Sequence, residues 1–223
     1  MKTVIFDLDG TLADTSGDLI AAANACFRGM GAGEMLDPVR DAATAMHGGR
    51  AMLRLGLGRL GIEDEAEIDR WFPVLIEAYR ADIDRHTVLF PGAMAAVAAL
   101  ADMGLPSGIC TNKPEALAEQ LLVSLGVREA FASLVGADTL PVRKPDPEPL
   151  REAARRAGGA PERCLLVGDT ITDRKTAEAA GVPCVLVTFG PSGAETGALA
   201  PEALIGGFDE LPGVVERLLG ADG

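Results

Sequence analysis

The feature that most constrains this chain is an apolar run near the N-terminus that ends in two acidic residues. Residues 4–6 are Val, Ile and Phe, and Asp7 and Asp9 follow with one Leu between them, before a Gly-Thr pair. The run predicts a buried strand. If the strand continued, Asp7 and Asp9 would point the same way, and two close carboxylates favour a hard cation such as Mg²⁺. The alternative is a simple hairpin, because Asp-Gly is a strong turn signal.

Length and charge limit the classes of partner. The chain has 223 residues, 48% of them hydrophobic, which is enough for one sizeable core and a smaller second module. It carries 33 acidic and 20 basic side chains, a net charge of -13, so like-charge repulsion argues against a nucleic-acid partner. An anionic substrate would need a local positive site.

Cysteine spacing and hydropathy predict a soluble, cytoplasmic protein that is not exported. Cys26, Cys110, Cys164 and Cys184 are far apart and form no Cys-x-x-Cys pair, so we expect reduced thiols. The N-terminus has no long apolar signal region, and no stretch approaches the roughly 20 apolar residues of a membrane span. We expect no membrane partner, and the sequence gives no indication of oligomeric state.

Short apolar runs alternate with helical patterns along the chain, which is typical of an α/β fold with a parallel sheet. Strands are predicted over residues 3–6, 106–110, 133–135, 164–168, 184–188 and 203–205. Roughly a hundred residues separate the first two strands, whereas the later crossovers are short. We therefore expect an insertion after the first strand.

The inserted segment has helical patterning. Thr15 to Asp18 resembles a capping box that opens a helix ending after Arg28, and Asp37-Pro38 predicts the start of another. Further helices are predicted over 50–60 and 64–84.

These patterns predict two domains. The core domain comprises residues 1–14 and 88–223, and the small all-helical cap domain comprises 15–87, bounded by Phe-Pro-Gly at 90–92.

A second polar group follows the strand predicted at 106–110. There Thr111, Asn112 and Lys113 precede a helix, so the Thr111 hydroxyl and the following backbone amides can hold a phosphate near a helix N-terminus. The alternative is ordinary helix capping by Thr or Asn. Lys113 is interpreted as a cation that neutralises an acidic rim.

A third group is the proline-rich segment around Lys144. Arg143 to Pro149 contains three prolines, which stiffen the backbone and can hold the Lys144 ammonium at a fixed place over an anion. The alternative is a solvated connector.

A fourth group again places an acid at the end of a strand. Asp169 follows the run over 164–168, and Asp173 comes four positions later. The alternative is helix capping by Asp169, or by Thr170 together with Asp173.

Taken in order, the four groups resemble the motifs of the haloacid dehalogenase superfamily. The first is Asp7 to Thr11, the second Thr111, the third Lys144, and the fourth Gly168-Asp169 with Asp173. This resemblance implies a Rossmann-like parallel sheet with helices on both faces. The helical insertion after the first motif, the Thr-Asn-Lys-Pro form of the second and Phe-Pro-Gly at 90–92 look like the phosphoglycolate-phosphatase-like branch. One departure is Arg174-Lys175-Thr176, where relatives commonly place an apolar residue that packs the helix.

The resemblance implies a Mg²⁺-dependent phosphomonoester hydrolase that works through an aspartyl phosphate. Asp7 would be the nucleophile, and Asp9 the acid and base whose backbone carbonyl also binds Mg²⁺. Thr111 and Lys144 would hold the transferring oxygens, with Asn112 beside them. Asp169 would complete the metal shell, and Asp173 would act through water or orient that shell.

The expected substrate is a small phosphorylated metabolite, above all an acid such as 2-phosphoglycolate. Arg50 or Arg54 in the cap can grip a carboxylate, although two arginines on a solvated helical face are an equally good interpretation. A sugar phosphate, pyrophosphate or a β-phosphoglucomutase-like phosphomutase activity stays open. The inserted helices argue against a receiver module, and Asp9 and Asp169 argue against a dehalogenase.

Overall fold

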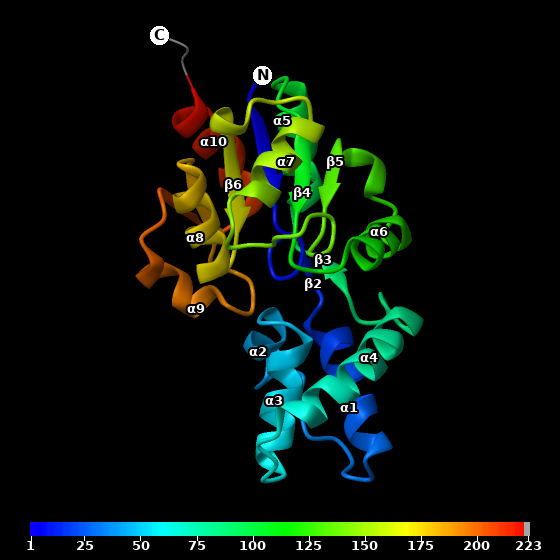
Figure 1. The fold of residues 1–223 in the computed structure, drawn as a ribbon. Helices are drawn as coiled ribbons and strands as arrows, with labels where there is room; N and C mark the ends of the chain where they lie inside the picture. The colour runs from blue at the N-terminus through cyan, green and yellow to red at the C-terminus, as the bar shows by residue number, and fades with distance from the viewer. Residues whose placement is uncertain (221–223) are drawn as a thin grey trace. The chain divides into compact units, whose positions relative to one another are not determined.

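The computed structural model describes residues 1–220, and the chain divides into two compact units (Figure 1). We call them the core unit, residues 1–13 with the chain from residue 89 onward, and the helical unit, residues 14–88. Each unit is described by itself.

The core unit is built on a parallel six-stranded sheet in the order β5-β4-β1-β6-β7-β8. The strands are β1 (Thr3–Phe6), β4 (Ser107–Cys110), β5 (Ser133–Val135), β6 (Cys164–Gly168), β7 (Cys184–Val187) and β8 (Ala203–Ile205). In register, Phe6 lies opposite Ile109 of β4 and Val167 of β6. The predicted fold class is confirmed, and the six predicted strands form within one residue of their expected bounds.

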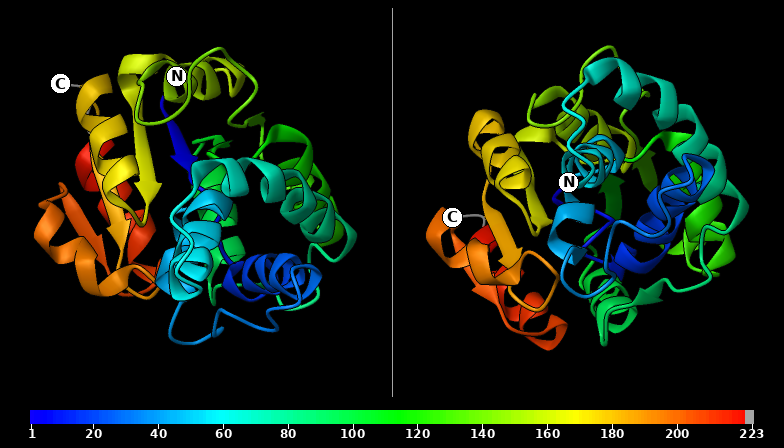
Figure 2. Two further views of the ribbon diagram at one scale, coloured as in Figure 1. Left: turned by 60° about the horizontal axis from the view of Figure 1, so that its bottom comes forward. Right: turned by 90° about the horizontal axis from the view of Figure 1, so that it is seen from below.

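Helices cover both faces of this sheet (Figures 1 and 2). On one face α7 contacts α8, and on the other α5 contacts α10. The α-helices are α5 (Ala93–Asp102), α6 (Glu115–Ser124), α7 (Glu148–Arg156), α8 (Ile171–Ala180), α9 (Gly193–Thr196) and α10 (Leu211–Leu219). The 3₁₀-helices are η1 (Arg128–Ala130), η2 (Pro161–Arg163), η3 (Gly197–Leu199) and η4 (Phe208–Glu210).

Burial on both faces explains why β1 is apolar from Val4 to Phe6. All four of its residues are fully buried. Ile5 belongs to the cluster that also contains Ala153 and Ala154 of α7, whose small side chains let the helix approach the sheet closely. Complete burial of a large aliphatic or aromatic side chain contributes about 1.5–3 kcal/mol, so this strand is a main source of core stability.

Strand order brings the predicted motifs to one edge of the sheet. From β1 the chain reaches β4 and β5 on one side, and then crosses to β6, β7 and β8 on the other. The carboxyl ends of β4, β1 and β6 are therefore neighbours where the strand order reverses. In open α/β sheets this is the position where ligands bind.

The helical unit consists of four helices that pack on one another (Figure 2). They are α1 (Ser16–Gly29), α2 (Ala42–Met46), α3 (Gly49–Arg59) and α4 (Glu65–Ala81). Gly56 of α3 is required by this packing, since a Cβ there would lie 2.1 Å from the ring of Phe27 on α1. Where the chain enters and leaves the unit, β2 (Ala13–Asp14) pairs with β3 (Val88–Leu89).

Two sequence predictions in this unit are wrong. The helix expected from Asp37-Pro38 begins only at Ala42, because residues 38–41 form a turn whose amides are held by the Asp37 side chain. The capping box expected at Thr15 to Asp18 also does not form.

Asp18 makes different contacts because it faces the segment that leaves the unit. Its carboxylate is buried and accepts hydrogen bonds from the His86 amide (3.0 Å), the Thr87 amide (2.8 Å) and the Thr87 hydroxyl (2.7 Å). The first turn of α1 is thereby tied to residues 86–87.

All four cysteines are buried and carry free thiols. Within residues 1–220, no helix combines the length and the apolar character that crossing a bilayer requires.

Candidate active site

The first motif does not continue β1 as a strand. After Asp7, whose amide donates to the Val167 carbonyl of β6 (2.8 Å), the chain turns so that the Leu12 and Ala13 amides donate to the carbonyl of Leu8. Gly10 takes a positive φ of 80°, which glycine adopts without strain. The Asp-Gly turn, which the sequence offered as the alternative to a continued strand, therefore forms and carries Asp9 past the end of β1.

Three buried aspartates meet at the carboxyl edge of the sheet. Asp7, Asp169 and Asp173 each offer a carboxylate oxygen within 4.8 Å of the others. Burial raises the pKa of Asp7 to about 6, against the opposing effect of Lys144. Burial also raises the pKa of Asp169 well above its ordinary value, and the neighbouring charges of Asp173 and Asp7 add to the effect. Without a bound metal ion, Asp7 and Asp169 therefore hold their protons more tightly than exposed aspartates do.

One oxygen of this cluster has no partner. Asp169 accepts a hydrogen bond from the Thr11 hydroxyl at Oδ1 (2.9 Å), but its buried Oδ2 accepts none. A buried carboxylate oxygen without a hydrogen bond costs about 1–3 kcal/mol or more, so a group that can bind it is expected there. Carboxylate oxygens are the ligands that Mg²⁺ prefers, and the set fits that ion.

Lys144 lies inside the acid cluster. It is 3% exposed, and its ammonium contacts Asp173 Oδ1 (2.6 Å) and Asp7 Oδ2 (3.1 Å). Although burial opposes the charged form, Asp173 and Asp7 raise the pKa of Lys144 above its ordinary value. The lysine is therefore a fixed positive charge beside Asp7.

Asp173 has both oxygens engaged. Oδ1 pairs with Lys144, and Oδ2 accepts from the Thr170 amide (3.1 Å) and hydroxyl (2.7 Å) at the start of α8. The helix-capping interpretation of Asp173 thus holds together with its place in the cluster. Few free lone pairs remain on it, which favours an orienting role over a direct metal bond.

Thr111 and Asn112 of the second motif make different hydrogen bonds. The buried Thr111 hydroxyl accepts from the Lys113 amide (3.1 Å), which leaves its own proton available to donate. Asn112 donates its side-chain N–H to the Lys144 carbonyl (3.0 Å), so it links the second motif to the third.

Lys113 does not neutralise an exposed rim, and that interpretation is wrong. The residue is 7% exposed, and its ammonium lies 2.6 Å from Asp9 Oδ1. Sequence reasoning missed this pair, and it also missed the bond from Thr11 to Asp169. The available signal was strand order, because a cation just after β4 lies beside the turn that follows β1.

Arg50 and Arg54, on α3 of the helical unit, are engaged within that unit. Arg50 pairs with Asp69 (2.7 Å) and Glu65 (3.3 Å), and Arg54 pairs with Glu65 (2.5 Å). All these side chains are largely exposed. A substrate carboxylate at Arg50 would have to compete with Asp69 and Glu65.

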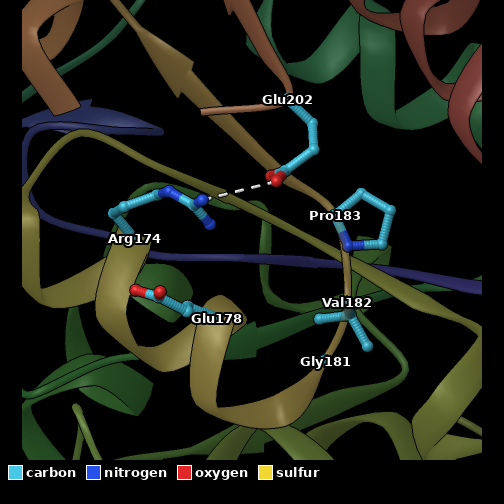
Figure 3. Close-up of a pocket in the computed structure, with 6 residues that line it drawn as sticks. All are labelled: Arg174, Glu178, Gly181, Val182, Pro183 and Glu202. Carbon is cyan, nitrogen blue, oxygen red and sulfur yellow. Dashed lines mark ion pairs between the residues drawn. The ribbon is translucent and has the colours of Figure 1, made fainter. Parts of the chain in front are cut away.

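A separate surface depression of about 370 Å³ lies beside α8 and the start of β7 (Figure 3). It is lined by Arg174, Glu178, Gly181, Val182, Pro183 and Glu202, and by no residue of the acid cluster. Here Arg174 reaches Glu202 (3.4 Å), while Thr176 and Ala177 bury the inner face of α8. The polar residues after Asp173 are therefore accommodated without exposing an apolar helix face.

Comparison with known proteins identifies the family. The model of the haloacid dehalogenase-like hydrolases matches residues 1–181. The chain belongs to this family. Two curated relatives are phosphoglycolate phosphatases, from Mesorhizobium japonicum (39% identity, covering 99% of this chain and 97% of the relative) and Rhodospirillum rubrum (38%, covering 94% and 89%). The crystal structure of a predicted phosphoglycolate phosphatase from Haemophilus somnus 129pt has the same fold, with a TM-score of 0.83 at 23% identity over 96% of this chain and 97% of that one.

These findings confirm the superfamily that the four motifs resemble and the prediction of a phosphatase-type enzyme. The roles of individual residues are proposals that rest on the distances and hydrogen bonds of the site.

Proposed function

We propose that this enzyme is a Mg²⁺-dependent phosphomonoester hydrolase that works through an aspartyl phosphate on Asp7. The observation that carries the proposal is the pairing of a buried carboxylate with a fixed cation, Lys144, beside the partnerless Oδ2 of Asp169. A nucleophile, a positive charge and a cation-binding oxygen are the groups that phosphoryl transfer requires.

The donor set supports a metal ion. Asp7, Asp169 and the backbone carbonyl of Asp9 would hold Mg²⁺, with Asp173 orienting the site or acting through water. When bound, the ion neutralises charge on the phosphoryl oxygens and brings them toward Asp7. The acid cluster and the phosphate would otherwise repel each other.

Asp7 and Asp9 take part in both chemical steps. An Asp7 oxygen bonds to phosphorus while the bond to the ester oxygen breaks, and Asp9 donates a proton to that oxygen. In the second step Asp9 takes a proton from water, the water oxygen bonds to phosphorus, and the aspartyl bond breaks to release phosphate. Thr111 would donate a hydrogen bond to a phosphoryl oxygen, and Lys144 would balance the charge of another.

The proposed substrate is a small phosphorylated acid, above all 2-phosphoglycolate. Full-length relatives at 38–39% identity carry that substrate in their names, which supports the proposal. We assign the helical unit as the cap that contacts the leaving group. Arg50 of this unit and Asn112 of the core unit are further candidates for binding the substrate. Buried free thiols support a cytoplasmic enzyme.

The test is phosphate release with Mg²⁺ across 2-phosphoglycolate, sugar phosphates and pyrophosphate, comparing kcat/KM, for the wild type and Asp7→Asn. The amide keeps the shape but removes the nucleophile, so turnover should vanish while the fold persists. Comparable release by Asp7→Asn would refute the mechanism. A preference for another monoester would change only the substrate, and retention of phosphate on a sugar would indicate a phosphomutase.

A further inference from the structure

Two buried lysines contact different carboxylates at the carboxyl edge of the sheet. Lys144 contacts Asp7 and Asp173, whereas Lys113 contacts Asp9 at 2.6 Å. The Asp9 side chain is 18% exposed and the Lys113 side chain 4%, so the ion pair is largely shielded from solvent. A charged lysine this deeply buried requires an acidic partner, and Asp9 supplies it.

The backbone of Lys113 is fixed on both sides. Its amide donates to the Thr111 hydroxyl (3.1 Å), and its carbonyl accepts from the Ala137 amide (3.0 Å) after β5. Pro114 follows, and its carbonyl begins α6 by accepting from Leu117. The lysine stem therefore starts from a loop between β4 and α6 whose backbone is held in place.

The turn that carries Asp9 is held independently. The Gly10 amide donates to the Ala13 carbonyl (2.9 Å), and the Gly190 position lies so close to the Gly10 carbonyl that a Cβ there would be 2.4 Å from that oxygen. With both backbones fixed, the ion pair selects the conformation of the Asp9 side chain. Without Lys113, the negative charge of Asp7 would push the Asp9 carboxylate away.

We infer that Lys113 is a positioning residue that holds the Asp9 carboxylate where it exchanges a proton with the leaving oxygen and then with water. This rests on the acid and base role of Asp9 in the proposed function. Lys113 keeps its own protons throughout, because the proton given to the leaving oxygen comes from Asp9. The contribution of Lys113 to kcat/KM should therefore depend on how much the leaving group needs protonation.

Three substrates separate this role from the alternatives. The leaving groups of 2-phosphoglycolate and phenyl phosphate need a proton, whereas p-nitrophenolate leaves without one. We expect Lys113→Met to lower kcat/KM about 10²-fold on the first two and less than about threefold on p-nitrophenyl phosphate. Lys113→Arg, which keeps the cation, should recover most of the loss. Lys175→Met on α8 makes the same charge change at an exposed site and should change none of the three.

A double-mutant cycle shows whether Lys113 acts through Asp9. In the Asp9→Asn background, adding Lys113→Met should cost less than about threefold on every substrate, since the group that it positions is already lost. Thermal melting checks that each variant is folded, and Lys113→Arg keeps the test available should Lys113→Met not fold.

Three outcomes would overturn the inference. Equal losses on all three substrates would indicate a general structural role, and a loss confined to 2-phosphoglycolate would make Lys113 a site for the substrate carboxylate. Losses that multiply fully in the Asp9→Asn background would show that Lys113 acts apart from Asp9. The proposed function fails on a different result, namely that wild-type turnover is absent or does not need Asp7. None of the three outcomes above implies that result.

Discussion

Lys144 shows how much one residue determines in this site. Lys144→Met keeps much of the volume of the stem but leaves Asp7 and Asp173 facing a phosphate without their cation. We expect kcat/KM to fall by 10²-fold or more, about 3 kcal/mol of transition-state stabilisation. Steady-state kinetics with 2-phosphoglycolate measures this, with melting as a folding check. Near-normal kcat/KM would mean that another cation holds the phosphate.

Asp169 permits a test that is independent of turnover. Asp169→Asn replaces a buried carboxyl group, which is costly to ionise and has no hydrogen-bond partner at Oδ2, by a neutral amide, so the metal-free variant should be at least as stable as the wild type. The same change removes a proposed metal ligand, so the stabilisation by Mg²⁺ should be largely lost. Melting with and without Mg²⁺ compares the two proteins, and an equal Mg²⁺ shift in both would place the ion elsewhere.

At this scale the sequence predicted residue types better than contacts. Asp7 and Asp169 were selected by their positions at strand ends, Asp173 by its spacing from Asp169, and Lys144 by the stiff proline-rich segment around it. The structure brings the four residues together. The pair between Lys113 and Asp9 was missed because it joins residues 104 positions apart across two loops. Spacing along the chain carries no information about which lysine reaches which acid.

Single elements were predicted well where burial decides them. Five strands, β1, β4, β5, β6 and β7, are buried along their whole length, so a short and mainly apolar run predicts each of them. β8 lies at the edge of the sheet and is partly exposed, and an apolar run predicts it as well. The helical unit was predicted less well at its helix starts, because Asp18 and Asp37 bind distant or neighbouring backbone instead of capping the helix expected there. Local capping patterns do not register such competition.

The contacts of Asp18 predict the stability of the helical unit. Asp18→Ala leaves the His86 and Thr87 amides without their acceptor, and the Thr87 hydroxyl keeps only the Ile83 carbonyl at 3.5 Å. Leaving a buried donor unsatisfied costs about 1–3 kcal/mol, so the two amides and the weakened hydroxyl bond together should lower the free energy of unfolding by about 3 kcal/mol. Urea denaturation measures the loss, and hydrogen exchange should speed up at residues 86–87. A loss below about 0.5 kcal/mol would mean that water replaces the carboxylate.

Thr87→Val is the matched variant for this comparison. It removes only the hydroxyl and keeps the shape of the side chain, so it should cost about 1 kcal/mol, clearly less than Asp18→Ala.

At the scale of the whole molecule, the acid cluster couples stability to pH and Mg²⁺. The pKa of Asp7 is about 6 in the folded chain and about 3.9 when unfolded, so its stabilisation is complete below about pH 4 and is lost as the pH rises through 6. Asp169 shifts in the same direction. Above pH 6 the cluster carries charge that Mg²⁺ can neutralise.

We therefore expect the increase in Tm on adding Mg²⁺ to be several degrees larger at pH 7.5 than at pH 5, where protons compete for Asp7 and Asp169. Thermal melting with and without Mg²⁺ at both pH values measures this difference. The same increase at both would show that the ion does not bind this cluster.

The ribbon of β2 and β3 has a consequence for how such a chain could have been assembled. The chain enters the helical unit through one strand and leaves it through the strand paired beside it, and Asp18 fastens the same two ends inside the unit. To the core unit the whole insertion is equivalent to a hairpin with a very large tip. The entropy of closing a loop rises only by about 0.6 kcal/mol for each doubling of its length. Helical units of other sizes and sequences could therefore be grafted onto the same two strands, which would let leaving-group preference change while the chemistry of the core is inherited intact.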